Sequence, residues 1–452
     1  MPYLNQILFV LVLGVAAWLI AKRVRFIKRN INLGQEQDRT DHKDLRLRNM
    51  LLVAFGQQKM FKRPIPAILH LFIYVGFLII NLEVLEFIID GFFGTHRFFA
   101  TLIGGEGVYT AAINFFEFLA VLVLLSCVVF LVRRNVVGIK RFSGLEMTNW
   151  PKLDANLILV IEIILMFAIL SMNAADYVLQ SMDPHYIKTG QLFFSGLLVP
   201  LFEGMDQGTL IMIERFAWWF HIIGILAFSV YITYSKHLHI FLAFPNTYYG
   251  DVKPKGEMRN MPVVTKEVKM MLGIPEEATA EEAAPEVPQA EGEIGRFGAK
   301  DVVDLSWKNI LDSYTCTQCG RCTDECPANK TGKKLSPRKI VMDVRQRAEE
   351  IGNSLDKGGK GANDGKSLFG DFITAEEINA CTTCNACVEA CPVMINPLDV
   401  ILQIRRYMAM EESSSPQEWQ IMFQNIETSF APWKFPPSDR FKWAEPLRDS
   451  NQ

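Results

Sequence analysis

The chain has 452 residues, half of them hydrophobic, and its formal net charge is −3 at pH 7. A nearly neutral chain lacks the basic footprint of a nucleic-acid-binding protein, so no nucleic-acid role is expected. The average hides a division, because the N-terminal half is apolar and the C-terminal half is polar. Eight of the nine cysteines fall in the polar half, whereas Cys127 lies in an apolar stretch that favours a core position.

Five segments are apolar and long enough to cross a bilayer, which needs about 20 residues. They run over residues 3–21, 66–89, 110–132, 155–174 and 216–240. The first segment has no basic residue ahead of it and no small-residue cleavage site, so we interpret it as a retained anchor. The sequence therefore predicts a five-helix transmembrane bundle.

The loops between these segments differ in their basic residues. Those after the first and third segments are rich in lysine and arginine, whereas the loop over 90–109 contains only Arg97. Basic loops face the cytoplasm, so we expect the N-terminus outside and the polar half in the cytoplasm. The expected location is a bacterial or archaeal cytoplasmic membrane. The apolar stretch Gln191–Phe202 is too short to span and is expected along the interface.

Histidines inside a bilayer usually mark function. On one continuous fifth helix, His221 and His239 are 18 residues apart, which is five whole turns, so they would share a face. His237 would then point about 200° away from His239. By depth, His70 of the second segment can meet His239, and we predict that this pair binds a haem b. His221 would contact a second haem or a quinone, or be a hydrogen-bonded bundle histidine.

Carboxylates at membrane depth are the second anomaly. A quinol site must exchange protons, and buried carboxylates can relay them. The candidates are Glu83, Glu86, Glu117 and Glu162. Some of them would instead pair or reach the interface, and the sequence does not choose among them. The remaining histidines lie in loops and give no functional signal: His42, His96 and His185.

Composition divides the chain into four parts. Residues 1–245 form the membrane domain with its haem and quinone sites, and residues 246–300 form a linker. The linker is acidic over 275–295, without lysine or arginine, and disorder is expected there. Residues 301–412 form a soluble domain. The tail over 413–452 is rich in aromatic residues and proline, which favours docking on a partner.

The most specific signal is the run Cys-x2-Cys-x2-Cys-x3-Cys-Pro, which begins at Cys316 and again at Cys381. This spacing is typical of two cubane clusters, in which the fourth cysteine of each run ligates the other cluster. Structural zinc usually takes two separated pairs of ligands, and disulfides need an oxidising compartment. We predict one [4Fe-4S] cluster on Cys316, Cys319, Cys322 and Cys391. We predict the second on Cys381, Cys384, Cys387 and Cys326.

Helix signals surround these cysteines. Ser336-Pro337 reads as an N-cap followed by a first-turn proline, and Thr374-x-x-Glu377 reads as a capping box. Val400–Met410 has helical spacing, and the glycine-rich stretch 357–366 is a loop. The predicted fold is therefore all-α: a transmembrane bundle plus a cytoplasmic α-helical ferredoxin domain.

Together these features resemble a known family. The membrane half, with YSKHLHIFLAFPN over Tyr234–Asn246, resembles the haem b subunits of respiratory nitrate reductase gamma type and of membrane heterodisulfide reductases. LDSYTCTQCGRCTDECPANKTGKKLSPRK and CTTCNACVEACPV resemble heterodisulfide-reductase-type iron–sulfur proteins. Similar fused chains occur in electron-transfer-flavoprotein:menaquinone oxidoreductases and in membrane complexes linked to sulfite reduction. The resemblance covers about 65–246 and 305–445.

The resemblance implies an electron-transfer subunit of a quinone-linked oxidoreductase complex. Electrons would pass between a cytoplasmic redox subunit, two [4Fe-4S] clusters, haem b and menaquinone or another quinone. Two departures matter. Many relatives continue into CCG domains, whereas this chain has no adjacent cysteine pair, so the substrate site is expected on a separate CCG-domain or flavoprotein partner. Relatives with two haems have two histidines on the second span, and only His70 is present here.

Two alternatives remain at this stage. The first is the membrane subunit of a heterodisulfide-reductase-like or sulfite-reduction complex, which only the neighbouring subunit would distinguish. The second belongs to another class, an iron–sulfur redox sensor or structural anchor. A sensor would be expected to carry one exposed cluster and an output domain.

Overall fold

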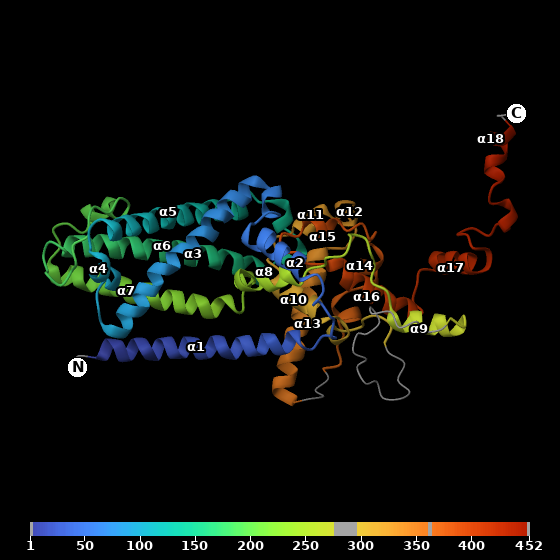
Figure 1. Ribbon diagram of the computed structural model, residues 1–452, viewed down its shortest axis with the longest axis horizontal. Coiled ribbons are helices and arrows are strands. Elements are labelled where there is room, and N and C mark those ends of the chain that lie inside the picture. The colour runs from blue at the N-terminus through green and yellow to red at the C-terminus, as the bar shows by residue number, and fades with distance from the viewer. Residues whose placement is uncertain (1–2, 275–295, 360–363, 450–452) are drawn as a thin grey trace.

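The computed structural model describes residues 3–274, 296–359 and 364–449. Within these ranges every regular element is a helix, which confirms the all-α prediction. Five long helices lie side by side at one end of an elongated molecule, and the short helices that carry the cysteines lie at the other end (Figure 1). The acidic stretch 275–295, for which disorder was expected, lies outside the described residues.

The long helices are α1 (Leu4–Ile31), α3 (Pro64–Phe93), α5 (Val108–Asn135), α6 (Trp150–Leu179) and α7 (Gln207–Ile232). Each is long and apolar enough to cross a membrane, and each overlaps one predicted segment. The connections contain α2 (Lys43–Asn49) and α4 (Phe98–Ile103). The apolar stretch between α6 and α7 forms two 3-10 turns, Ser195–Leu197 and Val199–Leu201. These helices indicate a membrane protein.

The fifth membrane helix ends earlier than the sequence predicts. It ends at Ile232 rather than at residue 240, and a 3-10 turn over Lys236–Leu238 leads into α8 (His239–Tyr248). The prediction that one continuous helix carries the histidines of this region is therefore wrong. The histidine that begins α8 belongs to a separate element.

Two side chains end the helix by binding backbone donors beyond it. The Ser235 hydroxyl accepts a hydrogen bond from the His237 N–H at 2.9 Å. Asp154 of α6 accepts one from the Lys236 N–H at 3.1 Å. Polar side chains that bind the backbone in this way compete with helix continuation. Since Asp154 comes from another helix, the break depends on tertiary packing.

Helix α1 lies at the edge of the bundle and packs on α3 and α7. Phe9 is 1% exposed, and its ring centre lies 6.0 Å from that of Trp218 in α7. Gly91 allows the Phe9 ring to lie close to α3, because a Cβ at that position would lie 2.7 Å from the ring. The aromatic contact therefore holds the outermost helix against the bundle.

The soluble half is built from short helices around two longer ones. They are α10 (Trp307–Thr315), α11 (Arg321–Glu325), α12 (Pro327–Lys330), α13 (Pro337–Gly358), α14 (Ala375–Asn379), α15 (Ala386–Ala390) and α16 (Pro397–Met410). Ser336 caps α13, and Thr374 and Glu377 form the capping box of α14, as predicted. Helix α16 begins earlier than predicted because Asn396 caps it.

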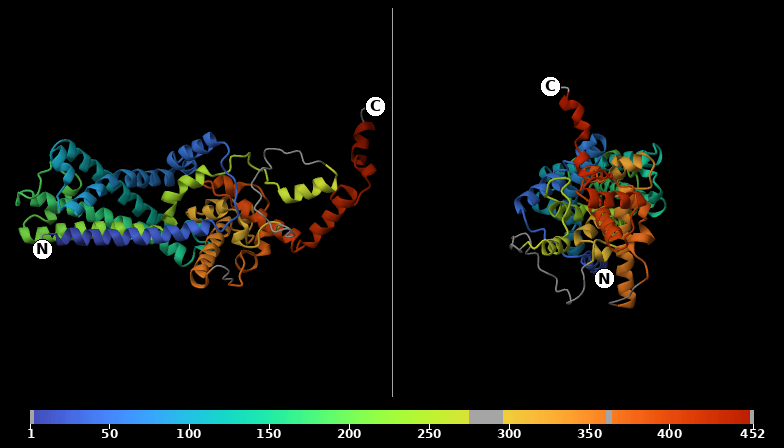
Figure 2. Two further views of the ribbon diagram at one scale, coloured as in Figure 1. Left: turned by 60° about the horizontal axis from the view of Figure 1, so that its bottom comes forward. Right: turned by 90° about the vertical axis from the view of Figure 1, so that its right-hand side faces the viewer.

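Two further regions adjoin this part. The stretch expected to be a linker contains the end of α8 and also α9 (Pro262–Met271). Beyond residue 412, α17 (Gln417–Ser429) and α18 (Glu445–Asp449) extend away from the rest of the molecule (Figures 1 and 2). The tail exposes large apolar side chains: Ile421, Phe423, Phe430, Trp433, Phe435, Phe441, Trp443 and Leu447.

The loop after α1 is part of the soluble half. The Gln35 N–H donates to the Leu305 carbonyl at 2.7 Å, and the Trp307 N–H donates to the Gln35 carbonyl at 3.0 Å. At the end of α1, the Asn30 side chain donates to the Tyr314 hydroxyl at 3.0 Å. The first membrane helix and the cysteine-bearing half are thus joined by direct hydrogen bonds.

Gly34 sits where this loop meets α10, and we expect Gly34→Ala to destabilise the contact. An added Cβ would lie 2.6 Å from the Trp307 nitrogen and 2.8 Å from the Leu305 oxygen, both backbone atoms. Overpacking of this kind costs about 1–3 kcal/mol. Thermal unfolding followed by circular dichroism and limited proteolysis of the loop would measure the loss.

The control is Gly14→Ala in α1, where an added Cβ meets nothing within 4 Å. Replacing glycine by alanine inside a helix should stabilise it by about 0.5–1 kcal/mol. Equal unfolding temperatures for the two variants would contradict the proposed close contact at Gly34.

Candidate functional site

Two small cavities in the soluble half are each surrounded by four cysteines. The membrane-side thiol cavity is lined by Cys316, Cys319, Cys322 and Cys391. The distal thiol cavity is lined by Cys326, Cys381, Cys384 and Cys387. Each cavity takes three thiols from one run and the fourth from the other run, which are the two sets grouped in the sequence analysis. All eight side chains are free thiols.

The two runs share one backbone conformation. Gln318 and Thr383 occupy equivalent positions, both with φ of +55°. Their N–H groups donate to the Cys316 and Cys381 sulfurs respectively, each at 3.4 Å. The left-handed residue turns the chain, so that thiols two positions apart face the same cavity. Hydrogen bonds to sulfur are among the means by which a protein tunes an iron–sulfur cluster.

The two thiol cavities differ in their surroundings. Next to the membrane-side cavity, the Arg321 guanidinium donates to the carbonyls of Lys59 and Met60, ahead of α3, at 3.2 and 3.4 Å. Asn246 at the end of α8 donates to the Val393 carbonyl at 2.8 Å. By contrast, the distal cavity contains Cys384, the exposed member of the eight cysteines. One cavity therefore faces the bundle and the other faces solvent.

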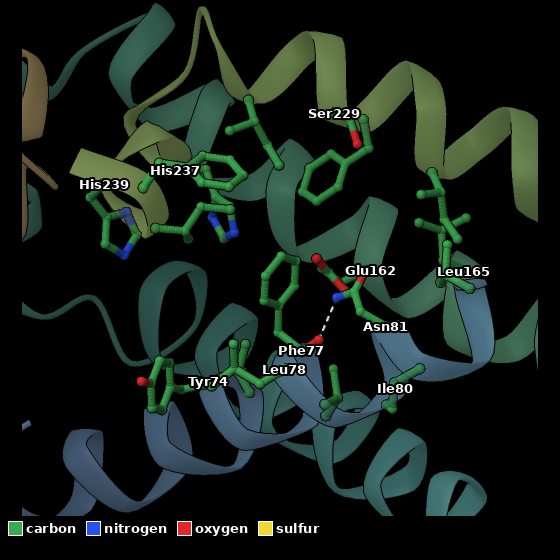
Figure 3. Close-up of a pocket in the computed structure, with 18 of the residues that line it drawn as sticks. Tyr74, Phe77, Leu78, Ile80, Asn81, Glu162, Leu165, Ser229, His237 and His239 are labelled. Atoms are coloured by element: carbon green, nitrogen blue, oxygen red, sulfur yellow. Dashed lines mark hydrogen bonds between the residues drawn. The ribbon is translucent and has the colours of Figure 1, made fainter. Parts of the chain in front are cut away.

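The bundle encloses a larger cavity next to the soluble half, of about 450 Å³ and mostly apolar. We call it the histidine cavity, because four imidazoles line it: His70, His221, His237 and His239. The ring centres of His70 and His239 lie 6.3 Å apart. Figure 3 shows His237 and His239 directed into this space. The prediction that His237 points away is wrong, because both residues follow the helix break.

The protonation of these imidazoles suits metal binding. The His239 Nδ1 lies 3.0 Å from the Lys236 carbonyl oxygen. Since a carbonyl can only accept, Nδ1 carries the proton and Nε2 keeps a free lone pair. Burial lowers the pKa of His237 to about 3 and also lowers the pKa of His239. Both rings are therefore neutral at pH 7. The Nδ1 atom of His70 is buried without a hydrogen-bond partner among the described residues.

His221 lines the same histidine cavity, deeper in the bundle. It is 2% exposed, and its ring neighbour is Phe87, with ring centres 5.6 Å apart. The structure therefore places His221 within one shared cavity and beside an apolar ring. It does not bring His221 opposite a histidine of the second membrane helix.

The structure separates the four membrane carboxylates. Glu162 lines the histidine cavity, where Figure 3 shows it beside Asn81. Glu117 accepts hydrogen bonds from the Phe194 and Ser195 N–H groups and therefore anchors the connection between α6 and α7. Glu83 and Glu86 line a different cavity at the far end of the bundle. Among the four, Glu162 is the carboxylate next to the histidines.

This far cavity is polar and includes a histidine that the sequence analysis assigned no function. The His96 side chain is 8% exposed, and its Nε2 lies 3.6 Å from Asp176. Arg97 also pairs with Asp176 and donates to Asn173 at 2.9 Å. Glu86 accepts a hydrogen bond from Tyr109 at 2.9 Å. Because these partners come from three separate helices and a loop, no local sequence signal identifies the group.

Comparison with known proteins agrees with the thiol geometry. A family model described as a 4Fe-4S dicluster domain matches residues 315–395. The chain is 26% identical to a probable iron-sulfur-binding oxidoreductase FadF of Bacillus subtilis, over 99% of this chain and 61% of that protein. It is 25% identical to an EtfAB:quinone oxidoreductase of Syntrophomonas wolfei, over 95% of this chain and 56% of that protein.

A shorter match lies in the soluble half. A component of a ferredoxin/F(420)H(2)-dependent CoB-CoM heterodisulfide reductase of Methanosarcina acetivorans is 31% identical, over 26% of this chain and 60% of that protein. The chain spans about three fifths of the length of the first two relatives. No solved structure matches it. The chain is therefore a homologue of iron–sulfur oxidoreductases and heterodisulfide-reductase-like proteins, and it carries a 4Fe-4S dicluster domain.

Proposed function

We propose that this chain is the membrane electron-transfer subunit of a quinone-linked oxidoreductase complex. It passes electrons between a cytoplasmic partner, two [4Fe-4S] clusters, one haem b and a membrane quinone such as menaquinone. The observation that carries the proposal is the order of the three cavities. The solvent-facing distal thiol cavity comes first, then the membrane-side thiol cavity, then the histidine cavity inside the bundle.

The thiol cavities supply the ligands of the two clusters. In this proposal Cys316, Cys319, Cys322 and Cys391 hold one [4Fe-4S] cluster, and Cys381, Cys384, Cys387 and Cys326 hold the other. The crossed sets and the N–H groups directed at Cys316 and Cys381 support this assignment. The exposure of Cys384 makes the distal cluster the point of exchange with a partner.

The His70 and His239 rings have a spacing that would let both hold one iron. A metal–imidazole bond is about 2.0 Å long, and each ring centre lies about 1.1 Å beyond its nitrogen, so two ligands have centres about 6 Å apart. The measured separation is 6.3 Å. The cavity volume of about 450 Å³ lies in the range of cofactor sites. Haem b bound there would supply a one-electron centre between the clusters and the quinone.

The quinone ring binds at the end of the histidine cavity where Asn81 and Glu162 lie. The walls there are mostly apolar, which suits a lipid-soluble ring, and the polar groups in the lining include the Asn81 side chain and the Glu162 carboxyl. Leu78 and Phe241 on the rim are 50% and 59% exposed, so the cavity borders the surface that faces lipid. His221 contacts the quinone rather than a second haem. Glu162 takes or gives the proton that accompanies each electron.

The loops support the orientation expected from charge. The basic loops after α1 and α5 both contact the soluble half, as in the Arg338 contact with the Arg141 carbonyl at 2.6 Å. Basic loops lie on the cytoplasmic side. The soluble half therefore faces the cytoplasm, and the N-terminus lies outside. The membrane is the cytoplasmic membrane of a bacterium or archaeon.

The partner is a cytoplasmic redox subunit that holds the substrate site. The name of the Syntrophomonas wolfei relative favours electron-transfer flavoprotein, reached directly or through a CCG-domain subunit. The shorter match to a heterodisulfide reductase component favours a second candidate, a heterodisulfide-reductase-like or sulfite-reduction complex. The tail over 413–449, with its exposed aromatic side chains, is the proposed docking segment.

Replacing either proposed haem ligand should remove the haem. We expect His70→Leu and His239→Leu each to abolish the haem b α-band in the dithionite-reduced visible spectrum. The iron–sulfur content should stay at about eight iron atoms per chain, because the clusters have their own ligands. His221→Leu should keep the α-band. If His237→Leu abolishes the α-band and His239→Leu does not, His237 would hold the haem in place of His239.

Removing the Glu162 proton carrier should slow quinol chemistry without affecting the haem. We expect Glu162→Gln to lower the rate of haem reduction by menaquinol by about 100-fold or more, the usual contribution of a positioned acid or base. Reduction by dithionite, which transfers no proton at this site, should be unchanged. Glu83→Gln, in the far cavity, is the matched control. Wild-type menaquinol rates in Glu162→Gln would contradict the assignment.

A further inference from the structure

Lys236 and Gln318 join the membrane-side thiol cavity to the histidine cavity. The Lys236 Nζ donates to the Gln318 Oε1 at 2.8 Å. Gln318 lies in the first cysteine run, and its N–H donates to the Cys316 sulfur at 3.4 Å. On the other side, the Lys236 carbonyl accepts the His239 Nδ1–H at 3.0 Å. Three hydrogen bonds and two residues thus lead from a sulfur atom to an imidazole.

The position of Lys236 is set from several directions. Its side chain is 9% exposed, and its Nζ also donates to the Pro151 carbonyl at 2.5 Å and lies 3.7 Å from Asp154. Asp154 also holds the Lys236 backbone N–H at 3.1 Å. Fixing a long side chain removes rotamer freedom, which costs up to about 2 kcal/mol. The main chain and the side chain of Lys236 are therefore both held in place. The carbonyl faces the histidine cavity, and the amine faces the membrane-side thiol cavity.

The bridge exists in only one of the two cysteine runs, both of which lie within the described residues. Thr383 takes the place of Gln318 in the second run, with the same backbone conformation. Its short hydroxyl donates to the neighbouring Thr382 carbonyl at 2.8 Å. The long side chain thus occurs in the run that faces the bundle, and the short one in the run that faces solvent.

We infer that Gln318 and Lys236 are positioning residues that couple the membrane-side cluster to the haem ligand His239. The inference rests on the proposed function, because it requires both groups to be bound. Electron tunnelling is faster along covalent and hydrogen bonds than across a gap. With both groups bound, the exchange would be of one electron, lost by the cluster and gained by the haem or the reverse, and Gln318 and Lys236 would transfer no proton.

The test replaces Gln318 with threonine, the residue at the equivalent position of the second cysteine run. Gln318→Thr keeps a side chain that this left-handed conformation accepts in the second run, but it cannot reach Lys236. Lys236→Met removes the donor from the other side. After laser-flash reduction of the exposed cluster by a deazaflavin radical, the rise of the haem α-band measures cluster-to-haem transfer. The haem midpoint potential is measured in parallel.

We expect Gln318→Thr and Lys236→Met each to slow the transfer severalfold. The double variant should be no slower than the slower single variant, because residues of one bridge are not additive. The haem spectrum and midpoint potential of Gln318→Thr should match the wild type. Glu349→Gln is the control, since it weakens another contact of the two halves, the 2.6 Å pair of Glu349 with Arg23, and it should leave the rate unchanged.

Two results would overturn the inference while leaving the proposed function intact. One is a wild-type transfer rate in Gln318→Thr with haem and clusters bound. The other is a slow rate accompanied by a shifted midpoint potential, which would assign the effect to the haem itself. Absence of a haem band in the unmodified protein would instead contradict the proposed function.

Discussion

Buried cations hold the soluble half of this protein against one end of its helix bundle. Arg338 is 1% exposed, donates to the Arg141 carbonyl at 2.6 Å and pairs with Glu146 at 2.8 Å. Lys236, pairing with Asp154, is buried in the same interface. Taking such charges out of water costs several kcal/mol each. The ion pairs offset this desolvation cost only when the two halves lie in the one arrangement that brings the charges together. These pairs therefore fix where the soluble half sits more than they add to stability.

Because the soluble half is held in place, the three cavities lie in a defined spatial order. Electron transfer weakens steeply with distance, so a mobile cluster domain would conduct poorly. The membrane-side thiol cavity is held by contacts on both sides, through Arg321 to the main chain ahead of α3 and through Asn246 to Val393. At the distal cavity, Cys384 is exposed. The asymmetry gives one cluster site a solvent face and the other a membrane face.

The interior of the helix bundle also differs between its two ends. Near the soluble half it is apolar with four imidazoles, and at the far end it is a network of carboxylates, arginines and Tyr109. An apolar surrounding favours the neutral form of an ionisable group. Glu162 is the carboxyl that lines the apolar cavity beside the imidazoles, whereas Glu117 accepts hydrogen bonds from backbone N–H groups.

Features that arise from local spacing were predictable from the amino-acid sequence. The cysteine runs, the five apolar segments, and the caps at Ser336 and Thr374 depend on residues a few positions apart. The structure has one long helix overlapping each segment, and it has both caps. The starts of α13 and α14 were predictable because each cap bonds within its own turn. The exact end of the fifth helix was not, because its cause lies on another helix.

The details of the sites depend on how the helices pack. Asp154 of α6 ends α7, which directs His237 into the cavity and places His239 at the start of a new helix. Helix packing also decides three other features. It places Glu162, of the four carboxylates, beside the histidines, it buries His96, and it turns the first cysteine run toward the bundle. Such contacts join residues far apart in the chain, and periodicity carries no information about them.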